Sequence, residues 1–152
     1  MARVTIAVED ADQPDVVRLL SESDAYFAGF YPPNSNHLLD VSALQRPEII
    51  FCAAREERKL VGMGALAVRA RDWGEIKRMY VVPTARGHGL GRIILEFLEQ
   101  LALGEGLRVL RLETGIRQEE ALRLYRSAGF RDVGPFEGYG PDPNSLFLEK
   151  SL

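Results

Sequence analysis

The chain has 152 residues, enough for one compact domain with a real core and short for two. Hydrophobic residues make up 46% of it and charged residues 27%, which is ordinary for a folded globular protein and excludes a disordered one. The net charge of −3 gives no general attraction to nucleic acid or to an anionic membrane. We therefore expect neither as a partner, and any anion site must be local.

Three further features indicate a cytoplasmic protein. The apolar runs are far shorter than the roughly 20 residues of a membrane span, and the first residues, MARVTIAVEDAD, lack the pattern of a signal peptide. Cys52 is the single cysteine, which excludes an internal disulfide and fits a reducing compartment. Because it lies in the apolar run 49–54, we expect it to be a buried small hydrophobe and not a nucleophile.

The N-terminal part predicts a strand, a helix and an irregular loop. Residues 3–8 alternate between apolar and polar side chains, as a strand does, and Pro14 suits the first turn of a helix over 13–29. The following YPPNSNHLLD, which begins at Tyr31 and includes His37, breaks this regularity with two prolines and two asparagines. It is either a loop packed by its own aromatic residues or a wall of a binding pocket.

A hairpin and a third strand come next. Residues 49–55 and 60–69 flank the polar turn REERK, 73–74 mark a second break, and 75–82 form a strand that ends before a proline. A regular strand would place Glu75, Lys77, Met79 and Val81 on one face, and Ile76, Arg78 and Tyr80 on the other. The alternation does not decide which face borders a site.

The segment RGHGLGR separates this strand from the strongest helix signal in the chain. Apolar residues recur there at helical spacing, at Leu90, Ile93, Ile94, Phe97, Leu98, Leu101 and Ala102, and glycines end the helix. A strand over 109–113, a helix over 118–128 and short strands at 131–133 and 146–149 complete the chain. This order predicts the α/β (α+β) class, as a single domain over residues 1–152 with a mixed sheet flanked by helices.

The glycine segment predicts a phosphate-binding site. At a strand-to-helix junction the first helical N–H groups lack partners and carry the positive end of the helix dipole, and glycines let an anion approach them. Arg86 and Arg92 add cations suited to phosphate. A P-loop is excluded because no Lys-Ser/Thr follows the last glycine. The two-and-two glycine spacing disfavours a dinucleotide fold, but Glu113 ends the next strand where a ribose-binding carboxylate could sit, so a nicotinamide site stays an alternative.

Two motifs together resemble the GNAT superfamily of acyl-coenzyme A N-acyltransferases. VVPTARGHGLGRIILEFLEQLA resembles its motif A, in which Arg86, Gly89 and Gly91 fill the signature Arg/Gln-x-x-Gly-x-Gly/Ala. Downstream, RQEEALRLYRSAGF resembles the second signature, a helix that ends Leu-Tyr-x-x-x-Gly-Phe. Four further segments, HLLD, GEIKRMYV, LETG and DPNSLFLEK, also resemble bacterial YsnE-like acetyltransferases. The resemblance implies a mostly antiparallel sheet that splays into a V between the fourth and fifth strands.

The resemblance also implies where acetyl-coenzyme A would bind. Its pyrophosphate is expected on Arg86, Gly87, His88, Gly89, Leu90, Gly91 and Arg92, and its pantetheine arm along Met79, Tyr80, Val81 and Val82. Gln118 stands where relatives often carry an asparagine that contacts the coenzyme, and this departure leaves the contact open. No metal is expected, because two distant histidines and one buried cysteine form no ligand cluster.

The same resemblance suggests catalytic roles. Tyr125 matches a tyrosine that protonates the leaving thiolate, and Glu75 matches a carboxylate that serves some relatives as the base. Glu113 or an ordered water is the alternative base, and Tyr125 could also be a core residue. Residues expected near the acceptor amine are Tyr31, His37, Glu113, Thr114 and Tyr139.

The sequence thus predicts transfer of an acetyl group from acetyl-coenzyme A to a primary amine of a small molecule by direct attack. A protein or peptide acceptor is a variant within the same class. A nicotinamide-dependent reductase and a non-catalytic coenzyme A-binding sensor are the alternatives of a different class. An edge strand near the C-terminus could pair across a homodimer.

Overall fold

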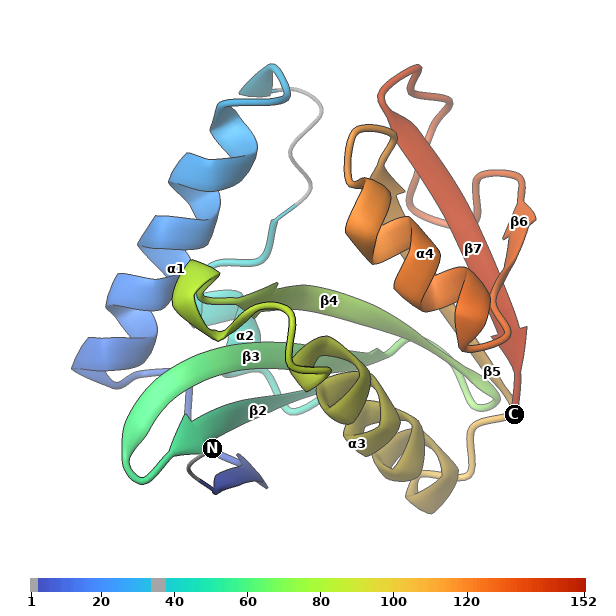
Figure 1. Ribbon diagram of the computed structural model, residues 1–152. Coiled ribbons are helices and arrows are strands. Elements are labelled where there is room, and N and C mark those ends of the chain that lie inside the picture. Colours follow the sequence, from blue (N-terminus) through green and yellow to red (C-terminus); the bar gives the residue numbers. More distant parts are fainter. Residues whose placement is uncertain (1–2, 34–37) are drawn as a thin grey trace.

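A single seven-stranded sheet organises the protein, which is described by a computed structural model over residues 3–33 and 38–152 (Figure 1). The strands are β1 (Val4–Val8), β2 (Ile49–Glu56), β3 (Lys59–Val68), β4 (Trp73–Val81), β5 (Val109–Gly115), β6 (Arg131–Val133) and β7 (Ser145–Ser151). They lie in the order β1-β2-β3-β4-β5-β7-β6, and every neighbouring pair is antiparallel except β4 and β5. The predicted mixed, mostly antiparallel sheet is confirmed. His37 lies outside the described residues.

Helices cover both faces of the sheet. They are α1 (Pro14–Ala28), α2 (Val41–Leu44), α3 (Leu90–Gly104) and α4 (Glu119–Ser127). The side chains of α3 and α4 pack into one apolar cluster and those of α1 and α2 into another, on opposite faces (Figure 1). The sequence pattern did not predict α2, a single turn capped by Asp40, whose carboxylate accepts the N–H of Ala43 at 2.8 Å. Within the described part of the chain, no helix is both long and apolar enough to cross a bilayer.

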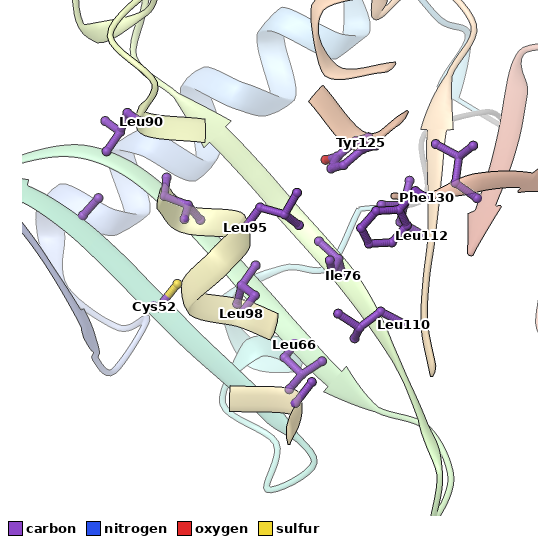
Figure 2. Packing of buried hydrophobic residues seen from close by; sticks show 14 of the residues in the cluster. Cys52, Leu66, Ile76, Leu90, Leu95, Leu98, Leu110, Leu112, Tyr125 and Phe130 are labelled. Atoms are coloured by element: carbon purple, nitrogen blue, oxygen red, sulfur yellow. The ribbon is translucent and has the colours of Figure 1, made fainter. Parts of the chain in front are cut away.

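The larger cluster lies beneath α3. Leu95 and Leu98 of α3 meet Ile76 of β4 and Leu110 of β5 there (Figure 2). Cys52 is fully buried in this cluster, and burial raises the pKa of its thiol to about 12. The expectation of a buried cysteine is confirmed, and the raised pKa disfavours the thiolate, which is the reactive species.

Strand β4 begins two residues earlier than the sequence predicted. The dipeptide at 73–74 is not a break, because Trp73 and Gly74 pair with Val109 and Leu110 of β5. A side chain at Gly74 would come within 2.7 Å of a Leu107 methyl carbon, so the glycine permits close packing inside the strand. The chain turns just before, where the N–H groups of residues 69 and 70 donate to the carbonyl of Trp73.

A β-bulge interrupts β4 at Arg78. Its φ of 58° is in the left-handed region, and the pairing with β3 shifts between Lys77 and Tyr80. Lys77, Arg78 and Tyr80 therefore all lie on the α1 face, whereas Met79 and Val81 join Ile76 in the cluster under α3. The predicted alternation was wrong from Arg78 onward, because the extra residue reverses the faces.

Candidate active site

The strands β4 and β5 separate at the centre of the sheet. Their parallel pairing ends at Ile76 opposite Leu112, although β4 continues to Val81 and β5 to Gly115. The bulge at Arg78 follows at once and bends β4. A cavity of about 650 Å³ lies at this separation and reaches side chains on both faces of the sheet. The predicted splayed V between the fourth and fifth strands is confirmed.

The glycine segment forms one end of this cavity. Gly87 and Gly89 have φ of 83° and 77°, and a Cβ at either would meet nothing within 4 Å. The first N–H groups of α3, on Leu90 and Gly91, have no acceptor in a preceding helical turn and carry the positive end of its dipole. This open backbone cradle is suited to an anion. Gly91 has a second use, because a Cβ there would lie 3.1 Å from Leu124 of α4.

The two arginines of the segment point to protein groups. Arg86 donates from Nε to the carbonyl of Val81 at 2.9 Å, and its guanidinium lies 5.1 and 5.3 Å from the ring centroids of Tyr26 and Tyr80. Arg92 donates to the hydroxyl of Ser127. Both line the cavity, but their first contacts brace the loop against its surroundings. An anion in this loop would therefore meet chiefly its N–H groups.

Tyr125 of α4 lies inside the cavity. It is 7% exposed, and its hydroxyl donates toward Sδ of Met79 at 3.6 Å. Figure 2 shows the oxygen directed away from Phe130, whose ring packs edge-on against it with centroids 5.8 Å apart. Burial, and then the charge of Glu113, raise the pKa of Tyr125 above the usual range. The phenol therefore remains a proton donor at neutral pH.

Gln118 and Thr114 line the same cavity. Gln118 is buried at the start of α4, and its Oε1 has no hydrogen-bond partner among the described residues. A buried amide oxygen without a partner is costly in a folded protein unless a ligand or water supplies the donor.

The two candidate bases have different surroundings. Glu113 lines the cavity and accepts a hydrogen bond from the hydroxyl of Ser145 at 2.7 Å. Glu75 is 2% exposed and is not among the lining residues. Arg69 and Lys77 bind its carboxylate at 3.0 and 3.4 Å. The ion pair with Lys77, which does line the cavity, therefore links Glu75 to it.

Tyr139 contacts Glu75 and Lys77 and does not line the cavity. Its hydroxyl donates to Glu75 and accepts from Nζ of Lys77 at 2.7 Å. Lys77 is 8% exposed, and burial lowers the pKa of its ammonium, a shift that the charges of Glu75 and Glu113 oppose. The sequence predicted Tyr139 near the acceptor amine, whereas in the structure its hydroxyl contacts Lys77 and Glu75 and only Lys77 reaches the cavity.

Tyr31 closes the opposite wall. Its ring lies against Gly115 at the end of β5, and its hydroxyl accepts the N–H of Arg117 at 3.1 Å. Tyr26, Phe27 and Tyr80 add aromatic surface on the same side. The sequence singled out Tyr31, with Phe27 and Phe30 beside it, but not Tyr26 or Arg117, because helix periodicity alone does not tell an aromatic residue that lines a cavity from one in a core.

Comparison with known proteins agrees with this geometry. Residues 16–130 match the model of the acetyltransferase (GNAT) family, and the chain belongs to that family. It is 50% identical over 153 residues to an IAA acetyltransferase of Azospirillum brasilense, and 37% identical over 149 residues to the N-acetyltransferase YsnE of Bacillus subtilis. The alignments cover 100% and 97% of this chain, and 100% and 99% of those proteins.

Solved structures show the same fold. A crystal structure from Klebsiella pneumoniae, named an acyl-CoA N-acyltransferase, superposes with a TM-score of 0.84 at 32% identity, covering 100% of this chain and 99% of that one. Other structures of this fold contain coenzyme A or acetyl-coenzyme A. The protein is therefore a GNAT acetyltransferase, and the resemblance found in its sequence motifs is confirmed.

Proposed function

We propose that the protein transfers the acetyl group of acetyl-coenzyme A to a primary amine of a small molecule by direct attack. The observation that carries this proposal is the cavity at the β4–β5 separation, which has the glycine cradle on the α3 side and an aromatic wall on the α1 side. A thioester held on one side of the sheet can meet an amine that enters from the other.

The residues present fit the coenzyme. The cradle at 87–92 offers open backbone for a pyrophosphate, and the unpartnered Oε1 of Gln118 can accept an amide N–H of the pantetheine arm. The end of β4, from Met79 to Val81, supplies backbone groups along the path between them, whereas Val82 follows the strand and does not line the cavity. When bound, the coenzyme supplies an activated acyl group and a thiol leaving group.

The side chains in the cavity can move the protons that this reaction needs. The amine nitrogen forms a bond to the thioester carbonyl carbon, the carbon–sulfur bond breaks, and Tyr125 donates its proton to the departing thiolate. A phenol of ordinary pKa and a thiolate have broadly similar basicity, and the raised pKa of Tyr125 keeps its phenol protonated until the thiolate departs. Direct attack is favoured over a covalent intermediate because Cys52 is buried in the core with its pKa raised to about 12.

A base is needed because an alkyl amine of pKa about 10 is almost wholly protonated at neutral pH. Glu113 is the better candidate, directly or through a water, since it lines the cavity and its charge reaches Tyr125. Glu75 remains a second candidate that acts through Lys77. Either carboxylate would receive the amine proton and pass it to solvent.

Thiol release with and without amines tests the proposal. Acetyl-coenzyme A and a panel of amino acids, polyamines, amino sugars and peptides should release free thiol above background with at least one small amine. A peptide acceptor would respond only to the peptides, and a sensor would bind coenzyme A without releasing thiol. A reductase would gain thermal stability from NAD and none from acetyl-coenzyme A, an outcome that would overturn the proposal.

A cytoplasmic location and a homodimer stay predictions. The edges of the sheet are β1 and the three-residue β6, so a dimer that pairs strands would use one of these. Size-exclusion chromatography with light scattering checks the homodimer.

A further inference from the structure

Three cations line the α1 side of the cavity. Lys77 and Arg78 come from β4, and Arg117 comes from the segment after β5. Lys77 and Arg78 are each less than 10% exposed, although they are neighbours in a strand and would ordinarily point to opposite faces. The bulge at Arg78 directs both toward the same side, at the expense of a left-handed backbone on a residue other than glycine.

The cations on this side have acidic partners, but one guanidinium donor is left over. Glu75 pairs with both Lys77 and Arg69, and the charge of Glu113 also reaches Lys77. Arg78 pairs with Asp24 at 2.7 Å and donates to the carbonyl of Leu20 at 3.1 Å. Its Nε is buried and has no hydrogen-bond partner in the described part of the chain, so one donor of the guanidinium is left over.

The third cation lies across the cavity from β4. Arg117 is exposed, and its guanidinium lies 5.2 Å from the ring centroid of Phe30. Among the described residues that line the cavity, the acids are Glu113, Glu119 and Glu120, and the last two lie in the first turn of α4. A ligand that carried only an ammonium group would offer no acceptor to Nε of Arg78 and would meet the positive charges of Lys77 and Arg117.

We infer that the acceptor carries an acid group beside its amine, on an aromatic or otherwise apolar body. In this arrangement, which rests on the proposed function, Glu113 faces the amine while Lys77, Arg78 and Arg117 face the acid group. Tyr26, Tyr31 and Tyr80 contact the apolar body. An α-amino acid with a carboxylate and its phosphonate analogue share this chemistry.

Matched pairs of ligands test the inference by binding. Isothermal titration calorimetry on the coenzyme A-saturated protein would compare phenylalanine with phenethylamine, tryptophan with tryptamine, and leucine with isopentylamine. Charge-assisted hydrogen bonds to the acid group should make the acid-bearing member bind roughly tenfold more tightly or better. A titration with the phosphonate analogue of phenylalanine is compared with that of phenylalanine itself. The tighter binder of the two shows whether the site prefers a phosphonate or a carboxylate. If no acid-bearing member binds more tightly than its matched amine, the inference is wrong.

Two variants identify the groups responsible. Arg117→Gln removes an exposed cation and should reduce the preference for the acid-bearing member, while binding of phenethylamine stays the same. Lys77→Met should also reduce the preference for the acid-bearing member if the variant folds. If it does not fold, Arg117→Gln alone decides the test. Arg71→Gln is the matched control, because Arg71 is exposed in the β3–β4 turn and does not line the cavity. A preference unchanged in both variants would overturn the assignment.

Turnover separates this inference from the proposed function. Acid-bearing ligands that bind preferentially but release no thiol from acetyl-coenzyme A would support the acid site and contradict the acetyl transfer. Thiol release that is as fast with the acid-free amines as with the acids would support acetyl transfer and contradict the acid site.

Discussion

The ring of Tyr31 occupies the space that a side chain at Gly115 would fill. A Cβ at Gly115 would lie 1.9 Å from the Tyr31 oxygen, far inside contact distance. The same oxygen accepts the N–H of Arg117, so the segment after α1 is held to the segment after β5. The glycine is what allows the acceptor wall to close.

Gly115→Ala should therefore damage the acceptor side of the site. Either Tyr31 moves and loses its bond to Arg117, or β5 shifts, at a cost of about 1–3 kcal/mol as in other overpacked sites. We expect a lower melting temperature and a larger rise in KM for the amine than for acetyl-coenzyme A. Gly104→Ala is the matched control, since a Cβ there meets nothing within 4 Å and the residue lies at the end of α3. Equal stability of the two variants would contradict this account.

A second pair of glycines separates backbone strain from ligand binding. Gly89 and Gly106 have φ of 77° and 79°, and a Cβ at either meets nothing within 4 Å. Alanine at each should cost about 1 kcal/mol of stability, because both force a left-handed backbone on a residue with a Cβ. Gly89→Ala alone should weaken coenzyme A binding, since its Cβ enters the cradle. Calorimetric titration with coenzyme A measures this, and equal affinity in both variants would remove the cradle from the site.

Tyr125→Phe tests the proton donor. Loss of the hydroxyl should leave the affinity for coenzyme A close to the original and lower kcat by about 100-fold, at the low end of general acid catalysis. Single-turnover thiol release measures the chemical step apart from product release. An unchanged rate of that step would assign Tyr125 to the core packing beside Phe130.

The buried phenol also predicts an alkaline limit to stability. The pKa of Tyr125 in the folded protein is raised above its unfolded value of about 10, so the stability that it contributes is fully present below that pH. This contribution is lost as the pH rises further, because the unfolded chain ionises first. Denaturant melts of Tyr125→Phe between about pH 9 and 11 should therefore show a shallower loss of stability than the unaltered protein. Parallel curves would contradict the burial of an un-ionised phenol.

Periodicity and local chemistry predicted most of the framework. The helix over 90–104 followed from its apolar spacing, and the hairpin and the β4–β5 order followed from strand patterns and the family motifs. These signals are local, and they survive folding because each apolar stripe must be buried against something. The glycine loop was located for the same reason.

Backbone irregularities at single residues could not be predicted from the sequence pattern. An arginine gives no local sign of a left-handed conformation, so the bulge at Arg78, and with it the faces of Met79 and Val81, could not be foreseen. The partners of Glu75 were hidden too, because Tyr139 is 64 residues away in the chain and reaches it through the loop before β7. Such contacts depend on tertiary packing, which a strand propensity does not encode.

Substitution of the two carboxylates near the cavity should have different effects, a loss of activity for Glu113 and a loss of stability for Glu75. Glu113→Gln keeps the size of a half-buried side chain and can still accept the hydrogen bond of Ser145, so we expect near-normal stability and a fall in kcat/KM for the amine of about 100-fold if this carboxylate is the base. Glu75→Gln leaves Arg69 and Lys77 without their shared anion, and a broken buried pair costs about 3–5 kcal/mol. Chemical denaturation and initial rates per folded molecule check both variants. If instead Glu113→Gln retained full activity while Glu75→Gln folded normally and lost turnover, the base would be Glu75 and its proton path would run through Lys77.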